Sequence, residues 1–333
     1  MRRWMMAGAI GALAAAGFVL VMRMERPASA QGVTLDPGLV ALLPPNATTL
    51  VGVELERLKG TSAWRRFEEQ HATDSHFEEF VQETGFDPRR DVQDLLVAST
   101  GEKQFVAAAR GVFDVTALGR KLREKNATIE SYRGFELFGP EAKPDRAQQD
   151  PGRFCFLDTR TALAGSRSEV LAALDRKAGG GASLASNQAL LGRAQQIGGT
   201  HQVWVVSDNP GQIVRRNFPG RRDAQASNFA RIFQAMKTTT FALDLTQGLD
   251  LRAAGTCGTA QDAKSLADAV RGLVAIGRLS ASDQEPDLLA VFDGIQVEDH
   301  NNELGITVRL DQGSFDKLLD KAEPRKRGAR SAD

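Results

Sequence analysis

The sequence predicts an α+β fold, with mixed, mostly antiparallel sheets packed with helices, and it allows a division into two similar halves. Short runs of alternating apolar and polar residues come in pairs around turn residues, as in β-hairpins. Apolar residues at helical spacing occupy the segments between these pairs. The 42% hydrophobic and 25% charged residues are ordinary for a folded body.

The first thirty residues have the three parts of a secretory signal. Arg2 and Arg3 precede an apolar run over residues 4–22, and Ala28-Ser29-Ala30 follows it. The run is also long enough to cross a bilayer, which takes about 17–25 residues. We therefore expect residues 1–30 to be a cleaved signal peptide or an uncleaved membrane anchor. In either case the body is expected outside the cytoplasm, periplasmic or anchored to the inner membrane.

The first half of the body is predicted over residues 31–178. Gly85 and Pro88 are expected to end its second helix, because Gly caps a helix and Pro cannot continue one. Ser166 and Glu169 have the spacing of a capping box at the start of its last helix. The predicted elements are a strand at 49–55, helices at 58–70 and 75–83, strands at 94–99 and 104–110, a helix after Asp114, hairpins at 128–138 and 154–164, and a helix after Ser166.

The second half is predicted over residues 201–322, after a linker and helix at 179–200 that begins with three glycines. A basic disordered tail is expected at 323–333. The predicted elements are a strand at 202–206, a helix at 226–236, strands at 239–245 and 249–257, a long helix after Thr259, a short helix at 286–292, a hairpin at 295–310 and a last helix around Phe315. Thr259 and Asp262 have a capping-box-like spacing at the start of the long helix, with Asp in the place of Glu. The long helix is expected to bury Ala263, Leu266, Val270, Leu273 and Val274. The element order resembles that of the first half and suggests a duplication.

Three short motifs carry a resemblance to known sequences. They are Leu43-Pro44-Pro45-Asn46-Ala47-Thr48, the segment from Gly85 to Val92, and Tyr132-Arg133-Gly134. In these motifs the chain resembles uncharacterised exported bacterial α+β proteins of the domain-of-unknown-function type. The resemblance implies export and an α+β repeat, and it brings no catalytic residues with it.

The charge balance does not favour nucleic acid as a partner. The whole chain is formally neutral, and without residues 1–30 it keeps 38 basic against 41 acidic residues. A nucleic-acid-binding protein would be expected to carry a basic stripe. The expected partners are instead the membrane, through residues 4–22 if they are uncleaved, and an envelope protein or a lipid.

The sequence assigns no catalytic, cofactor-binding or metal-binding residues, and it predicts no cofactor. His71 and His76 are five residues apart, not at the i, i+4 spacing of a zinc helix, and His201 and His300 have no motif around them. Cys155 and Cys257 are open to two interpretations, a disulfide permitted by export or two small buried side chains in strands.

Three functional hypotheses follow. The first is an exported non-enzymatic envelope protein with a binding or structural role. The second is a periplasmic ligand or lipid carrier that uses a cleft between the sheet and its helices. The third is a hydrolase whose triad is assembled from distant residues. A buried apolar cavity would favour the carrier, and clustered Ser, His and Asp side chains would favour the hydrolase.

Overall fold

The computed structural model describes residues 35–71, 75–101, 103–124, 128–139, 151–197, 201–210, 236–281 and 286–322. Within these ranges the fold is α+β, as the sequence predicts, and its strands form one twelve-stranded antiparallel sheet. The strands are β1 (Thr49–Glu54), β2 (Val92–Ser99), β3 (Phe105–Gly111), β4 (Thr128–Tyr132), β5 (Phe135–Gly139), β6 (Gly152–Asp158), β7 (Thr161–Ser166), β8 (Val203–Ser207), β9 (Met236–Asp244), β10 (Leu249–Cys257), β11 (Ile295–His300) and β12 (Glu303–Leu310).

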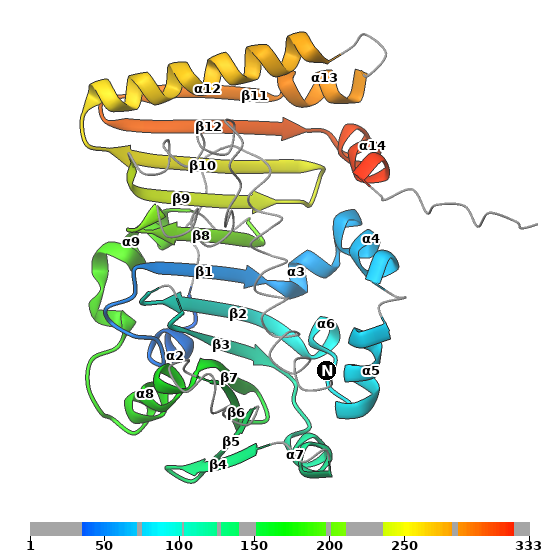
Figure 1. The fold of residues 1–333 in the computed structure, drawn as a ribbon, viewed down its shortest axis with the longest axis vertical. Helices are drawn as coiled ribbons and strands as arrows, with labels where there is room; N and C mark the ends of the chain where they lie inside the picture. The colour runs from blue at the N-terminus through cyan, green and yellow to red at the C-terminus, as the bar shows by residue number, and fades with distance from the viewer. Residues whose placement is uncertain are drawn as a thin grey trace, which may run out of the picture.

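The helices that follow and connect these strands cover both faces of the sheet and one of its edges (Figure 1). They are α2 (Pro37–Val40), α3 (Leu55–Lys59), α4 (Ser62–His71), α5 (Ser75–Thr84), α6 (Pro88–Asp91), α7 (Val115–Glu124), α8 (Arg167–Lys177), the 3₁₀ turn η2 (Leu184–Ser186), α9 (Gln188–Gln196), α12 (Ala260–Ser280), α13 (Pro286–Asp293) and α14 (Gln312–Ala322).

The strand order is β11-β12-β10-β9-β8-β1-β2-β3-β7-β6-β5-β4. We call the chain from β1 to α8 the first half and the chain from β8 to α14 the second half. Outward from the centre, the first half reads β1-β2-β3-β7-β6 and the second reads β8-β9-β10-β12-β11, so the two orders correspond. The first half adds the hairpin β4–β5 at its outer edge. The halves join where β1 pairs antiparallel with β8.

The centre of the sheet is buried on both faces. In β1 and β8 successive side chains point to opposite faces, as in any strand. Leu50, Trp204 and Val206 pack in a core with α2, α8 and α9, and Val53, Val203 and Val205 pack in a second core on the other face. Trp204 lies directly across from Gly52, where a Cβ atom would overlap the indole ring. The glycine therefore makes room for the largest fully buried side chain of the described chain.

Several local predictions are confirmed by backbone geometry. Gly85 has a positive φ of 74° after α5, as a helix C-cap requires. Arg133 and Gly134 have φ of 48° and 83° in the β4–β5 turn, the conformation that tight hairpins favour. Thr259 accepts a hydrogen bond from the backbone N of Asp262 at the start of α12, at 3.1 Å.

Other local predictions are wrong or fall outside the description. Ser166 makes no capping hydrogen bond; its hydroxyl donates to the Phe105 carbonyl on β3, and Glu169 accepts from Thr100. The single helix predicted at 58–70 is two helices, because α3 ends before Gly60 and α4 starts at Ser62. The helix predicted at 226–236 lies outside the described residues except for Met236, which begins β9. The tail at 323–333 also lies outside them.

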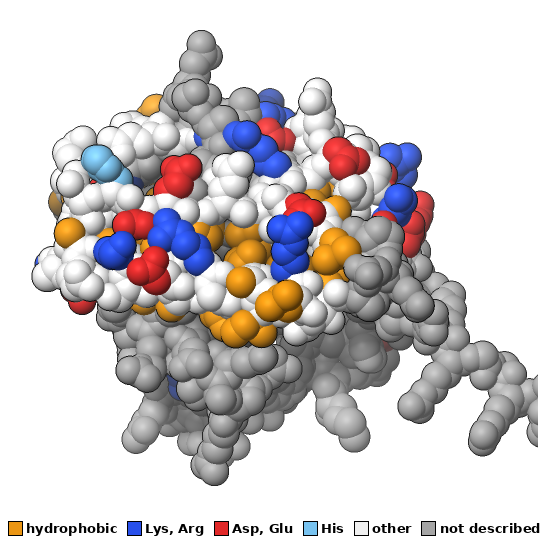
Figure 2. All heavy atoms as spheres, turned by 90° about the horizontal axis from the view of Figure 1, so that it is seen from above, with side chains coloured by type: hydrophobic (Ala, Val, Ile, Leu, Met, Phe, Trp, Pro, Cys, Tyr) orange, Lys and Arg blue, Asp and Glu red, His pale blue; other side chains and the backbone are white. Residues whose placement is uncertain are grey.

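The long helix α12 buries less than its sequence pattern predicts. Ala263 and Ala267 are buried, whereas Leu273 is 37% exposed. Figure 2 looks onto this edge of the molecule and shows apolar side chains at the surface among charged ones. The exposed apolar side chains of this region are Leu273, Ile276, Leu279 and Leu288. The pattern identified the helix correctly, but the sheet contacts only part of its apolar face.

Candidate functional site

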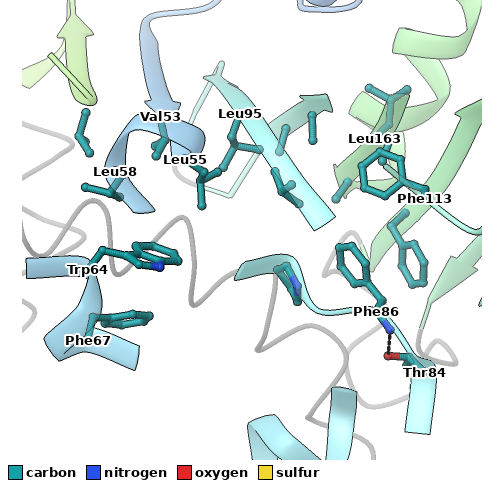
Figure 3. Close-up of a pocket in the computed structure, with 18 of the residues that line it drawn as sticks. Val53, Leu55, Leu58, Trp64, Phe67, Thr84, Phe86, Leu95, Phe113 and Leu163 are labelled. Atoms are coloured by element: carbon teal, nitrogen blue, oxygen red, sulfur yellow. Dashed lines mark hydrogen bonds between the residues drawn. The ribbon is translucent and has the colours of Figure 1, made fainter. Parts of the chain in front are cut away.

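An apolar cavity of about 220 Å³ lies between the sheet and the helices of the first half. Its floor is formed by strands from β1 to β3 with β6 and β7, and its walls include α3, α4, α6 and α7. Figure 3 shows Leu58, Trp64, Phe86 and Phe113 converging on this space from different elements. Val203, Leu245 and Leu319 extend the lining into the second half.

The lining offers almost no polar group to a ligand. Among the described residues of the lining, Arg66 is the one that is charged and Thr84 is the one that bears a hydroxyl. The Thr84 hydroxyl already accepts a hydrogen bond from the backbone N of Phe86 at 3.1 Å. Rings are closely packed along one wall, with centroids of Phe86 and Phe113 6.0 Å apart and those of Phe113 and Phe156 5.4 Å apart. Such a lining binds through burial of apolar surface and dispersion.

The space exists because the floor carries small side chains. Ala107 on β3 lies across from Ala164 on β7, and Ala109 lies across from Ala162. All four residues line the cavity, because alternate residues of neighbouring strands share one face. Cross-strand alanine pairs leave room that larger side chains would fill, so the helices above rest on the surrounding Leu, Phe and Trp side chains.

A polar cluster joins α4 and α14 at one end of the cavity. Ser62 donates a hydrogen bond to Asp316 at 3.0 Å, and Gln312 donates to Ser62 at 2.7 Å. Arg66 forms ion pairs with Asp316, at 3.7 Å, and with Asp320. We call these five residues the α4–α14 clasp. Next to it, Trp64, Phe67 and Leu319 line the cavity.

A second recess, near α2, is polar. Asp36, Asp94, Arg110 and Asp158 line it. Hydrogen bonds from the Arg110 guanidinium lower the pKa of Asp36. Asp94 has a raised pKa, caused first by burial and then by the nearby carboxylates of Asp36 and Glu56. Arg110 thus holds Asp36 ionised and fixes α2 to β3.

Of the histidines singled out by the sequence, the two whose side chains the structure describes, His201 and His300, do not line the cavity. His201 is buried just before β8, and His300 is exposed at the end of the edge strand β11. The side chains of His71 and His76 are outside the described part of the chain. Burial raises the pKa of Asp244, near His201, but hydrogen bonds from Thr246 and Gln202 outweigh it and lower the pKa overall. These bonds support the turn between β9 and β10.

The two cysteines are separate, buried thiols. Cys155 on β6 belongs to the core formed with α8, and burial raises its pKa to about 12. Cys257 ends β10, and burial also raises its pKa. Of the two interpretations of the sequence, small buried side chains in strands is the one that the structure bears out.

Sequence reasoning did not identify the cavity. The signal was present as alternating small residues in β3, which reads Phe-Val-Ala-Ala-Ala-Arg-Gly, and in β7, which reads Thr-Ala-Leu-Ala-Gly-Ser. Each stretch alone is an ordinary strand. The pattern gains meaning only when β7 is known to pair with β3, and these strands are separated in sequence by the hairpins and α7.

Comparisons with known proteins concern the fold only. No family model matches the chain, and no curated protein matches it at a significant level. Among solved structures, crystal form I of TP0453 is 11% identical, with a TM-score of 0.45, over 87% of this chain and 98% of that one. Crystal form III of TP0453 is 10% identical, with a TM-score of 0.47, over 86% of this chain and 99% of that one. At these scores the likeness carries no inference about ligand or activity.

Membrane association remains a prediction for the N-terminal segment. Residues 1–34 lie outside the described residues. Over the ranges that the structure does describe, no helix has both the length and the hydropathy needed to cross a bilayer.

Proposed function

We propose that this protein is an exported envelope protein that binds the hydrocarbon chain of a single-chain amphiphile and acts as its carrier. The observation that supports the proposal is the apolar cavity, in which Arg66 is the one charged residue among the described residues of the lining. Concave, mostly apolar spaces of this kind are typical of small-molecule sites. Export is supported by the signal-like first thirty residues.

The volume favours one chain over two. An engineered apolar cavity of about 150 Å³ holds a benzene ring, so by proportion a 220 Å³ space holds roughly nine carbons. Each methylene buried contributes about 0.8 kcal/mol, and nine contribute on the order of 7 kcal/mol. Before the ordering of the chain is subtracted, this corresponds to a dissociation constant on the order of 10 µM. A medium-length fatty acid or a lysolipid fits these limits.

Binding of a series of unbranched fatty acids to the full chain, followed by calorimetry, tests the proposal. Affinity is expected to rise with each carbon up to roughly nine and then to level off, because further carbons stay in water. Absence of binding for the whole series, or affinities that do not depend on length, would contradict the proposal.

A cavity-filling variant locates the binding. Ala162→Phe places a ring in the cavity from a half-buried floor position and is expected to weaken binding by at least about tenfold, since it displaces much of the bound chain. Ala254→Phe, at an exposed position on β10, is the matched control and should bind as the unmodified protein does. Equal affinity in both variants would place the ligand elsewhere.

A further inference from the structure

We propose that ligands enter and leave the cavity between α4 and α14, and that the α4–α14 clasp is the latch of this entrance. The inference rests on the proposed function, because a latch has meaning only if the cavity is occupied. It deepens that function by assigning the step that controls exchange. The walls of the cavity differ in the contacts that each would lose by moving.

The floor of the cavity cannot open at low cost. Its strands belong to the middle of the twelve-stranded sheet, where β2 and β3 each pair with a neighbour on both sides. Opening there would break ladders of backbone hydrogen bonds and leave buried donors without partners, at about 1–3 kcal/mol for each group. The floor is therefore a fixed surface.

Two of the helical walls are also held firmly. On α7 the lining residues Leu118 and Leu122 are almost fully buried. On α6, Asp87 caps the helix through the backbone N of Arg89, and the Arg89 side chain bridges Asp87 and Glu78. Moving either helix would expose buried leucines or break a network that is mostly shielded from solvent.

The contact between α4 and α14 has a different character. Its hydrogen bonds and ion pairs are partly open to solvent, with the Asp320 side chain 63% exposed and the Arg66 side chain 21% exposed. Exposed ion pairs contribute about 0–1 kcal/mol each, because water replaces the lost partner. We therefore expect that separating the two helices costs less than moving the floor, α6 or α7. Arg66 is also the one charged residue among the described residues of the lining, and its guanidinium pairs with the exposed Asp320 at the solvent side of this wall.

The attachment of α14 suggests how it moves. Its start is fixed, because Asp311 accepts a hydrogen bond from the backbone N of Ser314 and Phe315 is buried against the sheet core. Leu319 and Asp320 lie one turn further along and are only partly buried or exposed. A small rotation about the Asp311–Phe315 end would lift Leu319 from the cavity. The same movement would carry Asp316 away from Ser62 and Asp320 away from Arg66. Hinges of this kind commonly use the end of an element.

A reversible cross-link across the clasp tests the proposal. The Ser62 hydroxyl and the Asp316 carboxylate meet across the clasp, so Ser62→Cys with Asp316→Cys introduces one thiol on each helix at this contact, and loss of free thiol on oxidation shows that the disulfide has formed. The native Cys155 and Cys257 are buried and should not compete. Release of a fluorescent medium-chain fatty acid is measured by stopped flow in the oxidised and the reduced protein. We expect oxidation to slow release by at least about tenfold and reduction to restore it, because gating steps limit exchange.

A second cysteine pair controls for cross-linking itself. Thr49 and Ser207 face each other at the far ends of β1 and β8 from the cavity residues Val53 and Val203, with hydroxyl oxygens 2.8 Å apart. Oxidation of Thr49→Cys with Ser207→Cys should leave the release rate unchanged. Slowed release in this pair as well would mean that general stiffening, and not the clasp, controls exchange, and it would overturn the proposal.

A variant that weakens the α4–α14 clasp tests the proposal without the cysteine pair, in case that pair folds poorly. Asp320→Asn removes one ion pair of Arg66 at an exposed position, so we expect release to become faster by a few fold with folding intact. If the clasp disulfide forms and release is unchanged while binding persists, the entrance is elsewhere and the carrier function stands. If neither the unmodified nor the reduced protein binds any fatty acid, the carrier function itself fails.

Discussion

The two halves share a strand order but differ in the size of the side chains at corresponding places. In the first half β3 and β7 present the cross-strand pairs Ala107–Ala164 and Ala109–Ala162. In the second half the corresponding strands β10 and β12 present Leu249–Leu310 and Leu251–Val308, all four of them buried. The cavity lies above the alanine pairs. The comparison teaches that one backbone framework can give a filled core or a binding space, depending on a few side-chain volumes.

The junction between the halves offers the largest expected effect. Trp204→Ala removes a fully buried indole from the β1–β8 junction, and we expect it to lower the free energy of unfolding by about 3–5 kcal/mol. Urea unfolding followed by circular dichroism measures the change. Because the two halves share one sheet and one core across this junction, both should unfold in a single transition. Two separate transitions would show that the halves are independent.

A double-mutant cycle sharpens this test. Gly52→Ala alone places a methyl group against the Trp204 ring and should destabilise by about 1–3 kcal/mol. In the Trp204→Ala background the same change meets an empty space, so its cost should largely disappear. Equal costs in both backgrounds would mean that the close approach of Gly52 and Trp204 is not what limits this position.

An Ala→Val substitution should change the free energy of unfolding in opposite directions in the two halves. Ala109→Val on β3 adds two methyl groups facing the cavity and is expected to stabilise by about 0.5–1 kcal/mol. Ala242→Val on β9 adds them in a packed core directly across from Trp204 and is expected to destabilise by about 1–3 kcal/mol. Both residues are in strands, so strand propensity cancels. The midpoints of urea unfolding measure both changes in stability. If both variants gain or both lose stability, the space around the side chain is not what sets the effect.

The smallest expected effect concerns the link between α2 and the first half. Arg110 lowers the pKa of Asp36, so the pair stabilises the fold above the unfolded pKa of Asp, about 3.9, and this contribution is lost as the pH falls through the folded value. After screening by solvent we expect Asp36→Asn to cost about 1 kcal/mol or less at pH 7. Unfolding midpoints at pH 7 and pH 3 should show the difference shrinking in acid. A difference that stays constant with pH would exclude the ion pair as its source.

Elements with a strong periodic pattern were predictable from the sequence. The strand predicted at 249–257 is β10, and the hairpin turn at Arg133-Gly134 has the expected positive φ angles. Caps were predictable where the competing partners are local, as at Thr259. The cap predicted at Ser166 does not form, because the Ser166 hydroxyl donates instead to the Phe105 carbonyl on β3, 61 residues away in sequence. A sequence pattern cannot show that such a partner is closer than the helix start.

The site was much less predictable than the elements. A cleft between sheet and helices was one of the functional hypotheses, but no residue of it was named. The cavity depends on which strands are neighbours, and the pairing of β3 with β7 follows from the tertiary arrangement. The clasp depends on α14 returning to α4 across 254 residues of sequence, which is the separation of Ser62 and Asp316. The duplication also stays a prediction. A duplicated chain would be expected to have corresponding strand orders in its two halves, and these halves have them.

The central position of β1 has a consequence for how the chain acquires its fold. β1 is the first strand of the described part of the chain. One of its two partners, β8, begins about 150 residues later, with Thr49 and Ser207 158 residues apart. At a synthesis rate of about 5–20 residues per second, the edge of β1 that pairs with β8 stays without this partner for roughly 8–30 s. During that interval β1 can pair with β2, but its other edge offers unpaired backbone groups to any extended chain. The nascent protein is therefore open to misassociation at β1, the strand that later lies at the centre of the sheet.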